Sequence, residues 1–403
     1  MMSTFVPAAR VTRIKPSPSV AAAALARDLK AAGRDIVDLT VGEPDFDTPD
    51  PIREAGKAAI DAGQTRYTAV NGTPALRDAI VAAHQRQTGR PCPHNRITIG
   101  GGGKQVIFLC LMASLDAGDE VIIPAPYWVS YPDMVLANEG VPVIIPSSEA
   151  QGFKISPEAL EQAIKPRTKW LVLNIPGNPS GAAYSHNELQ AMAAVLARHP
   201  HVRILTDDIY DQVWFEDMPI TRLSVVAPEL DDRIFAVNGV SKTYAMTGWR
   251  MGWGIGEPAL IAAINTLQSQ MSSCPSSVSQ AATVAALNGP QTFPAQSSAV
   301  YRRRRDMAVS LLRAAPGLTC LSPSGAFYLF PGCAGLVGKT TPQGKPVNSD
   351  RDFVLYLLES EGVATIHGAA YGLSPHFRLS IATSDAILRE GCERIVRACA
   401  ALR

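Results

Sequence analysis

The chain has 403 residues, enough for a large core and for more than one domain. Its residues are 46% hydrophobic and 18% charged, as in ordinary globular proteins. The net charge of +1 excludes the global basic footprint of a nucleic-acid-binding protein, and no stretch is long and apolar enough to span a membrane.

The cysteines and histidines indicate neither disulfides nor a metal site. The seven cysteines form an odd set without a C-x-x-C pair, which is typical of reduced thiols, so we expect a cytoplasmic protein. The seven histidines are scattered and make no metal-ligand pattern. We therefore predict no metal.

Near the N-terminus, basic residues precede the apolar stretch Val20 to Ala26, an order that imitates a signal peptide. Prolines intervene at positions 16 and 18, and Arg27 and Asp28 end the stretch. We therefore expect a first amphipathic helix here.

From about residue 96 to residue 256, short β-branched segments alternate with helical patterns. Strands are predicted at 96–99, 120–123, 141–146, 170–174, 203–206, 233–237 and 251–255, and helices begin near Lys104, Trp128, Pro157 and His186. Ser185 and Glu188 have the spacing of a capping box. The alternation predicts an α/β domain around a mostly parallel sheet, with ligands beyond the carboxyl ends of the strands.

Helical patterns dominate from residue 258 to about residue 315, and a mixed pattern follows. In the long helix expected over 294–315, we interpret the basic run Arg302 to Arg305 as a solvated face. Strand-like segments then occur at 326–330, 363–366 and 377–381, with helices near 352–361 and 385–402. We expect a large domain of residues 48–290 and a smaller α+β domain of residues 1–47 and 291–403.

Four glycines and Lys104 lie between a predicted strand and a predicted helix, at residues 100–104. Bare backbone N–H groups and a helix N-terminus can face an anion there, and phosphate is the natural guest. Gln105 stands where G-x-G-x-x-G requires its last glycine, and no Ser or Thr follows Lys104 as in a P-loop. A flexible turn is the alternative, although ordering four glycines on folding costs much conformational entropy.

Lys242 lies among apolar and small residues, with Arg250 shortly after it. A lysine amine forms an imine with a carbonyl only when it is unprotonated, and a poorly hydrated site or a nearby cation lowers its pKa. A surface charge is the alternative. Asp207 and Tyr210 follow another predicted strand, where an N-cap or a surface turn is the alternative. The segment 174–181, rich in amides and prolines, is by itself good turn chemistry.

Taken together and in order, these segments resemble the class I and II aminotransferases. These are fold type I enzymes that depend on pyridoxal 5′-phosphate (PLP), and the resemblance is to their bacterial aspartate aminotransferase-like subgroup in particular. It rests on residues 41–46, 66–67, 100–104, 126–128, 174–181, 207–210, 241–250 and 377–380, and so covers nearly the whole chain. It implies a large PLP-binding α/β domain with a mostly parallel sheet flanked by helices, plus a smaller α+β domain.

The resemblance assigns roles around the cofactor ring. Lys242 would hold PLP as an imine and then move a proton between the substrate Cα and the cofactor. Asp207 would pair with the ring nitrogen, which keeps the ring an electron acceptor. Asn178 and Tyr210 would bond to the ring 3-oxygen, and Trp128 would stack on the ring.

The resemblance also implies a phosphate site and a dimer. The phosphate would lie against Arg250, Ser241 and the amides of Gly102, Gly103 and Lys104. Many relatives carry Ser or Thr where this chain has Gly239, so that contact is missing or replaced. Tyr67 would reach the phosphate of the neighbouring subunit, which implies a homodimer with active sites at the subunit interface.

Arg378 is implied to clamp the substrate α-carboxylate with its planar fork, assisted by Gly42 and Asn178 and with Trp128 beside the substrate. A structural salt bridge is the alternative for this arginine. The implied reaction is ping-pong transfer of the amino group of an L-amino acid to a 2-oxo acid such as 2-oxoglutarate (EC 2.6.1 class). A β-eliminating C–S lyase of the same fold is the alternative, and a non-catalytic PLP-binding regulator is a remote one.

The sequence leaves the amino donor undecided among aspartate, aromatic and broad ranges. Aspartate-preferring members need a second cation, which in some relatives comes from the helix after the glycines. Residues 105–112 of that helix carry no cation, which favours neutral, aromatic or broad donors. An arginine from elsewhere, such as Arg13 or one from the partner chain, is the alternative.

Overall fold

The computed structural model describes residues 5–16 and 18–403, and its largest sheet has seven strands. These are β2 (Ile97–Gly100), β3 (Glu120–Pro124), β4 (Val141–Ile145), β5 (Thr168–Asn174), β6 (Arg203–Asp207), β7 (Ile234–Gly239) and β8 (Gly252–Ile255). Their order is β2-β8-β7-β6-β5-β3-β4. Strand β8 runs antiparallel to β2 and β7, and the other pairs are parallel. The prediction of a mostly parallel sheet is confirmed.

Helices cover both faces of this sheet, because its strands are apolar on both sides. Trp170 and Val172 of β5 pack in one cluster with α5 (Gly103–Ser114), α6 (Ser130–Ala137) and α10 (Pro258–Met271). Leu171 and Leu173 point to the other face, where α7 (Pro157–Ala163), α8 (His186–Arg198) and α9 (Leu223–Val226) lie. Helices α3 (Asp50–Asp61), α4 (Pro74–Thr88) and α11 (Ser277–Asn288) pack around the edge formed by β2 and β8.

Helix α8 begins at the predicted residue with the predicted cap. The Ser185 hydroxyl accepts from the Glu188 N–H at 3.3 Å, and the Glu188 carboxylate accepts from the Ser185 N–H at 2.7 Å. This reciprocal pair satisfies backbone donors that the first helical turn leaves free.

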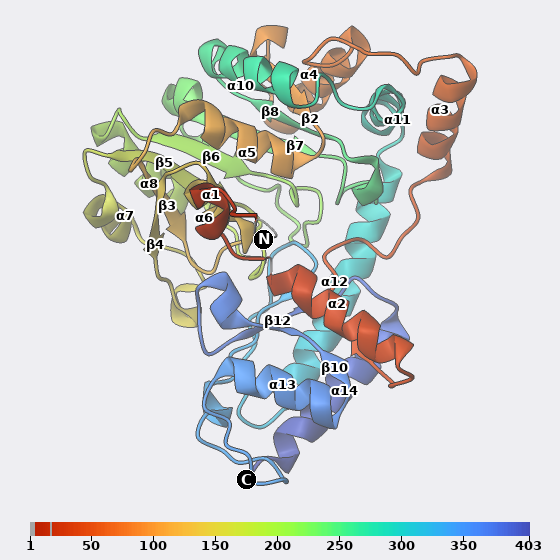
Figure 1. Ribbon diagram of the computed structural model, residues 1–403, viewed down its shortest axis with the longest axis vertical. Helices are drawn as coiled ribbons and strands as arrows, with labels where there is room; N and C mark the ends of the chain where they lie inside the picture. Colours follow the sequence, from red (N-terminus) through yellow and green to blue (C-terminus); the bar gives the residue numbers. More distant parts are fainter. Residues whose placement is uncertain (1–4, 17) are drawn as a thin grey trace.

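The C-terminal part forms a second, smaller layer, shown below the main sheet in Figure 1. It holds β9 (Tyr328–Leu329), α13 (Asp350–Ser360), β10 (Val363–Ala364), β11 (Ile366–His367), β12 (Phe377–Ser380) and α14 (Asp385–Ala401). Strands β11, β12 and β9 pair antiparallel in that order. The long helix α12 (Thr292–Arg313) runs from the upper part of the molecule into this layer.

The N-terminal segment packs with the C-terminal part, as expected. Strand β1 (Val37–Asp38) pairs with β10, and α2 (Pro18–Ala31), the expected first helix, contacts β10 and β11. The short helix α1 (Ala9–Thr12) was not predicted and contacts α6. Residues 1–4 and 17, which the predicted small domain includes, lie outside the described residues. The domain boundaries at 48 and 290 stay a prediction.

The interpretation of Arg302 to Arg305 as a solvated face is wrong for two of the four residues. Arg304 is 6% exposed, and its guanidinium donates to Asp45 at 2.9 Å and to Asp385 at 2.8 Å. Arg305 is 8% exposed and donates to the Pro323 carbonyl. One face of α12 is buried in the core, so arginines on that face are retained where carboxylates and carbonyls satisfy them.

All seven cysteines are free thiols, and six of them are buried. Within residues 5–16 and 18–403, no His, Cys, Asp and Glu side chains gather in a group of three or more that would hold a metal ion. In the same ranges, none of the helices combines the length and the apolar character that a bilayer crossing requires.

Candidate active site

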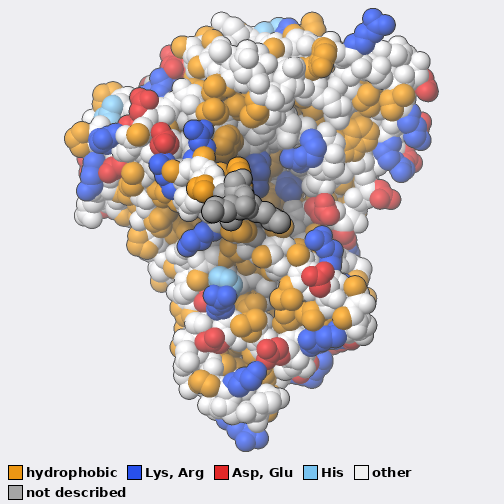
Figure 2. Space-filling model, in the orientation of Figure 1, with side chains coloured by type: hydrophobic (Ala, Val, Ile, Leu, Met, Phe, Trp, Pro, Cys, Tyr) orange, Lys and Arg blue, Asp and Glu red, His pale blue; other side chains and the backbone are white. Residues whose placement is uncertain are grey.

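A cavity of about 680 Å³ opens between the main sheet and the C-terminal layer, a size typical of sites for small molecules. Figure 2 shows this hollow, with Lys and Arg side chains gathered inside it. Its lining includes Gly42, Gly103, Lys104, Trp128, Asn178, Asp207, Tyr210, Ser241, Lys242, Arg250 and Arg378. The structure therefore brings together the predicted site residues other than Gly102 and Tyr67.

Lys242 follows the carboxyl end of β7 and projects into this cavity. Its Nζ donates to the Gly42 carbonyl at 2.6 Å. Burial is the main cause that lowers the Lys242 pKa to about 8; Glu43 and Asp207 oppose this shift, and Arg250 and Arg378 add to it. An amine with this pKa is partly unprotonated near neutral pH, as an imine-forming lysine requires.

Asp207 ends β6 and is 5% exposed. Its carboxylate accepts from the Tyr131 hydroxyl at 2.6 Å and from the Ile209 N–H at 3.3 Å. Burial raises the Asp207 pKa to about 6, although these hydrogen bonds and Lys242 lower it. No lysine or arginine of the described chain lies within ion-pair distance of this carboxylate. The Asp207 carboxylate is therefore suited to pair with the N–H of a protonated pyridine ring.

Two glycines allow Arg250 and the start of α5 to converge on one side of the cavity. Gly102, the N-cap of α5, has φ +96, and a Cβ there would lie 2.4 Å from Arg250 Nη2. A Cβ on Gly252 would lie 2.4 Å from the Gly103 nitrogen. With Ser241 nearby, this cradle of N–H groups and a guanidinium fits a phosphate.

Gly239 has no hydroxyl for the phosphate contact that the family resemblance implied, and the structure gives a reason. A Cβ at this position would lie 2.8 Å from the Met251 carbonyl oxygen of the antiparallel neighbour. A Ser or Thr would therefore require a backbone shift. Ser241, two residues further along the chain, brings a hydroxyl to the lining of the cavity.

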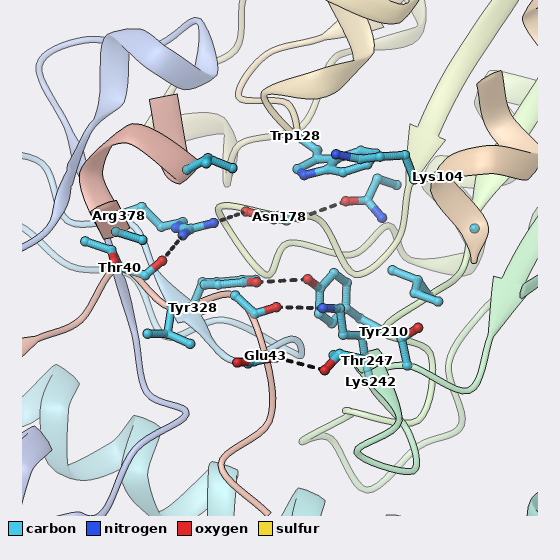
Figure 3. Close-up of a pocket in the computed structure, with 18 of the residues that line it drawn as sticks. Thr40, Glu43, Lys104, Trp128, Asn178, Tyr210, Lys242, Thr247, Tyr328 and Arg378 are labelled. Atoms are coloured by element: carbon cyan, nitrogen blue, oxygen red, sulfur yellow. Dashed lines mark hydrogen bonds between the residues drawn. The ribbon is translucent and has the colours of Figure 1, made fainter. Parts of the chain in front are cut away.

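Arg378 lies on β12 and is a buried cation, 2% exposed. Nη1 donates to Asn178 Oδ1 at 3.1 Å and Nη2 to the Thr40 carbonyl at 2.7 Å (Figure 3), while Nε is buried without a partner. The guanidinium lies 4.3 Å from the centre of the Tyr328 ring and 5.2 Å from that of Tyr371.

Among the described residues, no carboxylate pairs with Arg378, so the salt bridge considered from the sequence is not formed. A buried cation without an anion is costly, and it fits an incoming carboxylate. The fork geometry of arginine suits bidentate binding of that group.

Two further tyrosines of the site, Tyr131 and Tyr328, were not predicted from the sequence. Tyr131 donates to Asp207, and its place on the helix expected after Trp128 was the available signal. Tyr328 lies on β9 with its hydroxyl 3.0 Å from that of Tyr210. Burial raises the Tyr210 pKa, so this phenol is neutral. The predicted strand at 326–330 gave no chemical signal for Tyr328.

Among the described residues, Lys104 is one of five cationic side chains that line the cavity, with Arg27, Lys242, Arg250 and Arg378. Its Nζ lies 4.7 Å from the centre of a Trp128 ring, and burial, followed by Arg250, lowers its pKa. Residues 105–112 carry no cation, but Lys104 directly before them does. The sequence drew attention only to the backbone amide of Lys104. Arg13 pairs with Glu139 and does not line the cavity.

Tyr67 does not line the cavity of its own chain. Its side chain is 89% exposed and borders a second hollow together with Arg66 and Ser277.

The fold and this site define a PLP-dependent enzyme of fold type I. The chain matches the family model of the class I and II aminotransferases over residues 34–395. It belongs to this family.

The relatives are aminotransferases along their whole length. The chain is 51% identical over 392 residues to the aspartate/prephenate aminotransferase of Cereibacter sphaeroides, which covers 97% of this chain and 98% of that one. The crystal structure of the aspartate aminotransferase from Rhizobium meliloti matches with a TM-score of 0.97 at 49% identity, over 99% of this chain and 100% of that one. The aspartate aminotransferase from Thermus thermophilus with maleate matches with a TM-score of 0.91 at 37% identity, over 98% and 100%.

These findings confirm the predicted family, fold, cofactor and class of reaction. The protein is a PLP-dependent aminotransferase that acts on small molecules. The lyase and regulator alternatives are not favoured.

Proposed function

We propose that this aminotransferase uses dicarboxylic amino acids such as aspartate as donors and 2-oxoglutarate as an acceptor. The observation that carries the proposal is that Arg378 and Lys104 line the same cavity, with Arg378 placed for the α-carboxylate and Lys104 for the distal one. In Figure 3 the two side chains enter the cavity from different sides, with Trp128 beside Lys104. The relatives named for aspartate and prephenate, and the Thermus structure with maleate, support it, since each of these compounds carries two carboxylates.

The roles of the remaining side chains follow from their places around the cavity. PLP, when bound, supplies an electron sink for the bond that breaks at the substrate Cα. Lys242 would take the proton from the substrate Cα as general base and pass it to the cofactor as general acid. Asp207 keeps a proton on the ring nitrogen, and Tyr210 and Asn178 donate to the ring oxygen.

Binding and orientation are the tasks of the other predicted residues. Arg250, Ser241 and the amides of Gly102, Gly103 and Lys104 hold the phosphate, and Trp128 covers the ring. Arg378, with Asn178 and the backbone of Gly42, fixes the α-carboxylate so that Cα faces Lys242. We further propose a homodimer in which Tyr67 completes the partner's site. The cytoplasmic location stays a prediction.

The donor range is tested by replacing Lys104 with a neutral residue of similar length. In Lys104→Met the backbone amide is kept, so kcat/KM for aspartate should fall about 10- to 100-fold while that for phenylalanine stays within about threefold. The measurement is a coupled assay of amino transfer to 2-oxoglutarate. The matched control is Lys57→Met, which changes an exposed lysine outside the cavity.

Two outcomes would count against this proposal. An equal loss for both donors would mean that Lys104 serves the cofactor and not the substrate side chain. A wild-type enzyme that prefers phenylalanine or alanine to aspartate would restore the broader donor range expected from residues 105–112.

A further inference from the structure

Tyr328 lines the cavity between two groups of the proposed site and has no role in it so far. It lies on β9 and is 1% exposed. Its hydroxyl lies 3.0 Å from the Tyr210 hydroxyl, and its ring lies 4.3 Å from the Arg378 guanidinium. Figure 3 shows Tyr328 between these two residues, with the bond to Tyr210 drawn.

The direction of the bond between the two phenols matters, because each phenol has a single proton to donate. Either hydroxyl can be the donor in this pair. If Tyr210 donates to Tyr328, its proton is no longer available to a group in the cavity. If Tyr328 donates to Tyr210, the Tyr210 proton is free to point at the ring oxygen.

The surroundings hold the Tyr328 hydroxyl where it meets Tyr210. A Cβ on Gly42 would lie 3.1 Å from this hydroxyl, so the backbone at Gly42 closes one side. The two tyrosine rings meet edge to face, with centroids 5.8 Å apart. The Arg378 guanidinium lies over the Tyr328 ring, and this contact helps to hold the ring in place.

We propose that Tyr328 is a positioning residue whose hydroxyl donates to Tyr210 and thereby directs the Tyr210 proton to the cofactor ring oxygen. In such a chain each bond polarises the next, so Tyr328 also makes Tyr210 a stronger donor. The inference rests on the proposed function, since it takes the place of Tyr210 at the ring oxygen from there.

The test is an absorbance titration of the PLP-bound enzyme against pH. A hydrogen bond donated to the ring oxygen favours its anionic form, so a weaker donor raises the pKa of the bound cofactor. Tyr210→Phe should raise that pKa by about one unit or more, and Tyr328→Phe by about half a unit. The double variant should match Tyr210→Phe alone, because Tyr328 acts through Tyr210.

Tyr328→Phe keeps the ring under Arg378, so the carboxylate site is the internal control. Its affinity for maleate, measured by calorimetry, should stay within about twofold of wild type. A parallel loss of maleate binding would show a general disturbance of the site and would overturn the inference.

The remaining outcomes separate this inference from the proposed function. A shift in Tyr210→Phe with none in Tyr328→Phe overturns the inference alone. Shifts that add in the double variant also overturn it, because Tyr328 would then act independently. An unshifted Tyr210→Phe overturns the proposed role of Tyr210 and the inference with it.

Discussion

At the scale of single residues, the charges around Lys242 decide when its amine can react. Burial, Arg250 and Arg378 favour the neutral amine, whereas Glu43 and Asp207 favour the ammonium. The Glu43 carboxylate faces this part of the cavity and accepts from the Thr247 hydroxyl at 2.8 Å (Figure 3). The resulting pKa of about 8 places the titration close to neutral pH.

We expect the cofactor-free protein to attach PLP at a rate that depends on pH. The rate should rise about tenfold per pH unit below pH 8 and level off above it, because the amine loses its proton there. Glu43→Gln should move this profile to lower pH, since Glu43 raises the Lys242 pKa. Stopped-flow absorbance measures the rate. Asp47→Asn is the control, and a profile that stays in place in Glu43→Gln would contradict the expectation.

The role of a single residue could be predicted where the residue lies at the end of a strand. It could not be predicted where the role depends on a contact with a residue far away in the sequence. Asp207 ends β6 and Lys242 follows β7, so the pattern of strands placed them in one cavity. The proposed role of Tyr328 depends on its contact with Tyr210, which lies 118 residues away along the chain. Arg304 is buried because Asp45 and Asp385 come from two other segments, which charge patterning along one helix does not reveal.

At the scale of elements, the contact between β8 and the start of α5 shapes the phosphate cradle. Gly252 begins β8 directly against Gly103, the first residue of α5. The alternation of strands and helices predicted both elements, but it gave no sign that β8 runs antiparallel to its neighbours. That direction brings the glycines together, and it depends on long-range pairing.

Gly252→Ala should therefore weaken PLP binding. Its Cβ would lie 2.4 Å from the Gly103 nitrogen, so the start of α5 must shift, and we expect about a tenfold or larger rise in the Kd of PLP. Gly248→Ala is the matched control, since a Cβ there meets no atom within 4 Å. Absorbance or fluorescence titration gives both values. Equal affinities in the two variants would disprove this account of the cradle.

At the scale of the whole molecule, the exposure of Tyr67 bears on the proposed dimer. Tyr67 is 89% exposed beside a hollow, so its side chain is accessible to a second subunit. If Tyr67 completes the partner's site, Tyr67→Ala and Lys242→Ala subunits complement each other in a mixed dimer. One of the two sites would then be intact.

We expect coexpression of these two inactive or weakened chains to restore about a quarter of wild-type activity at limiting PLP, because half of the random dimers are mixed. Differently tagged chains allow the mixed dimer to be purified and its amino transfer measured. Lys242→Ala alone is the control for residual turnover. Activity no higher than the mean of the separate variants would mean that each chain builds its site alone.

Arg378 is buried without a paired carboxylate, and this gives the two ends of the cavity different parts in substrate recognition. The folded protein carries the cost of an uncompensated cation until a carboxylate arrives, so part of any carboxylate's binding energy is relief of that cost. Every α-amino acid brings the same α-carboxylate and gains the same relief, whether or not it is a good donor. Under the proposed function, selectivity among donors then comes from the end of the cavity at Lys104, whose side chain is still reached by water.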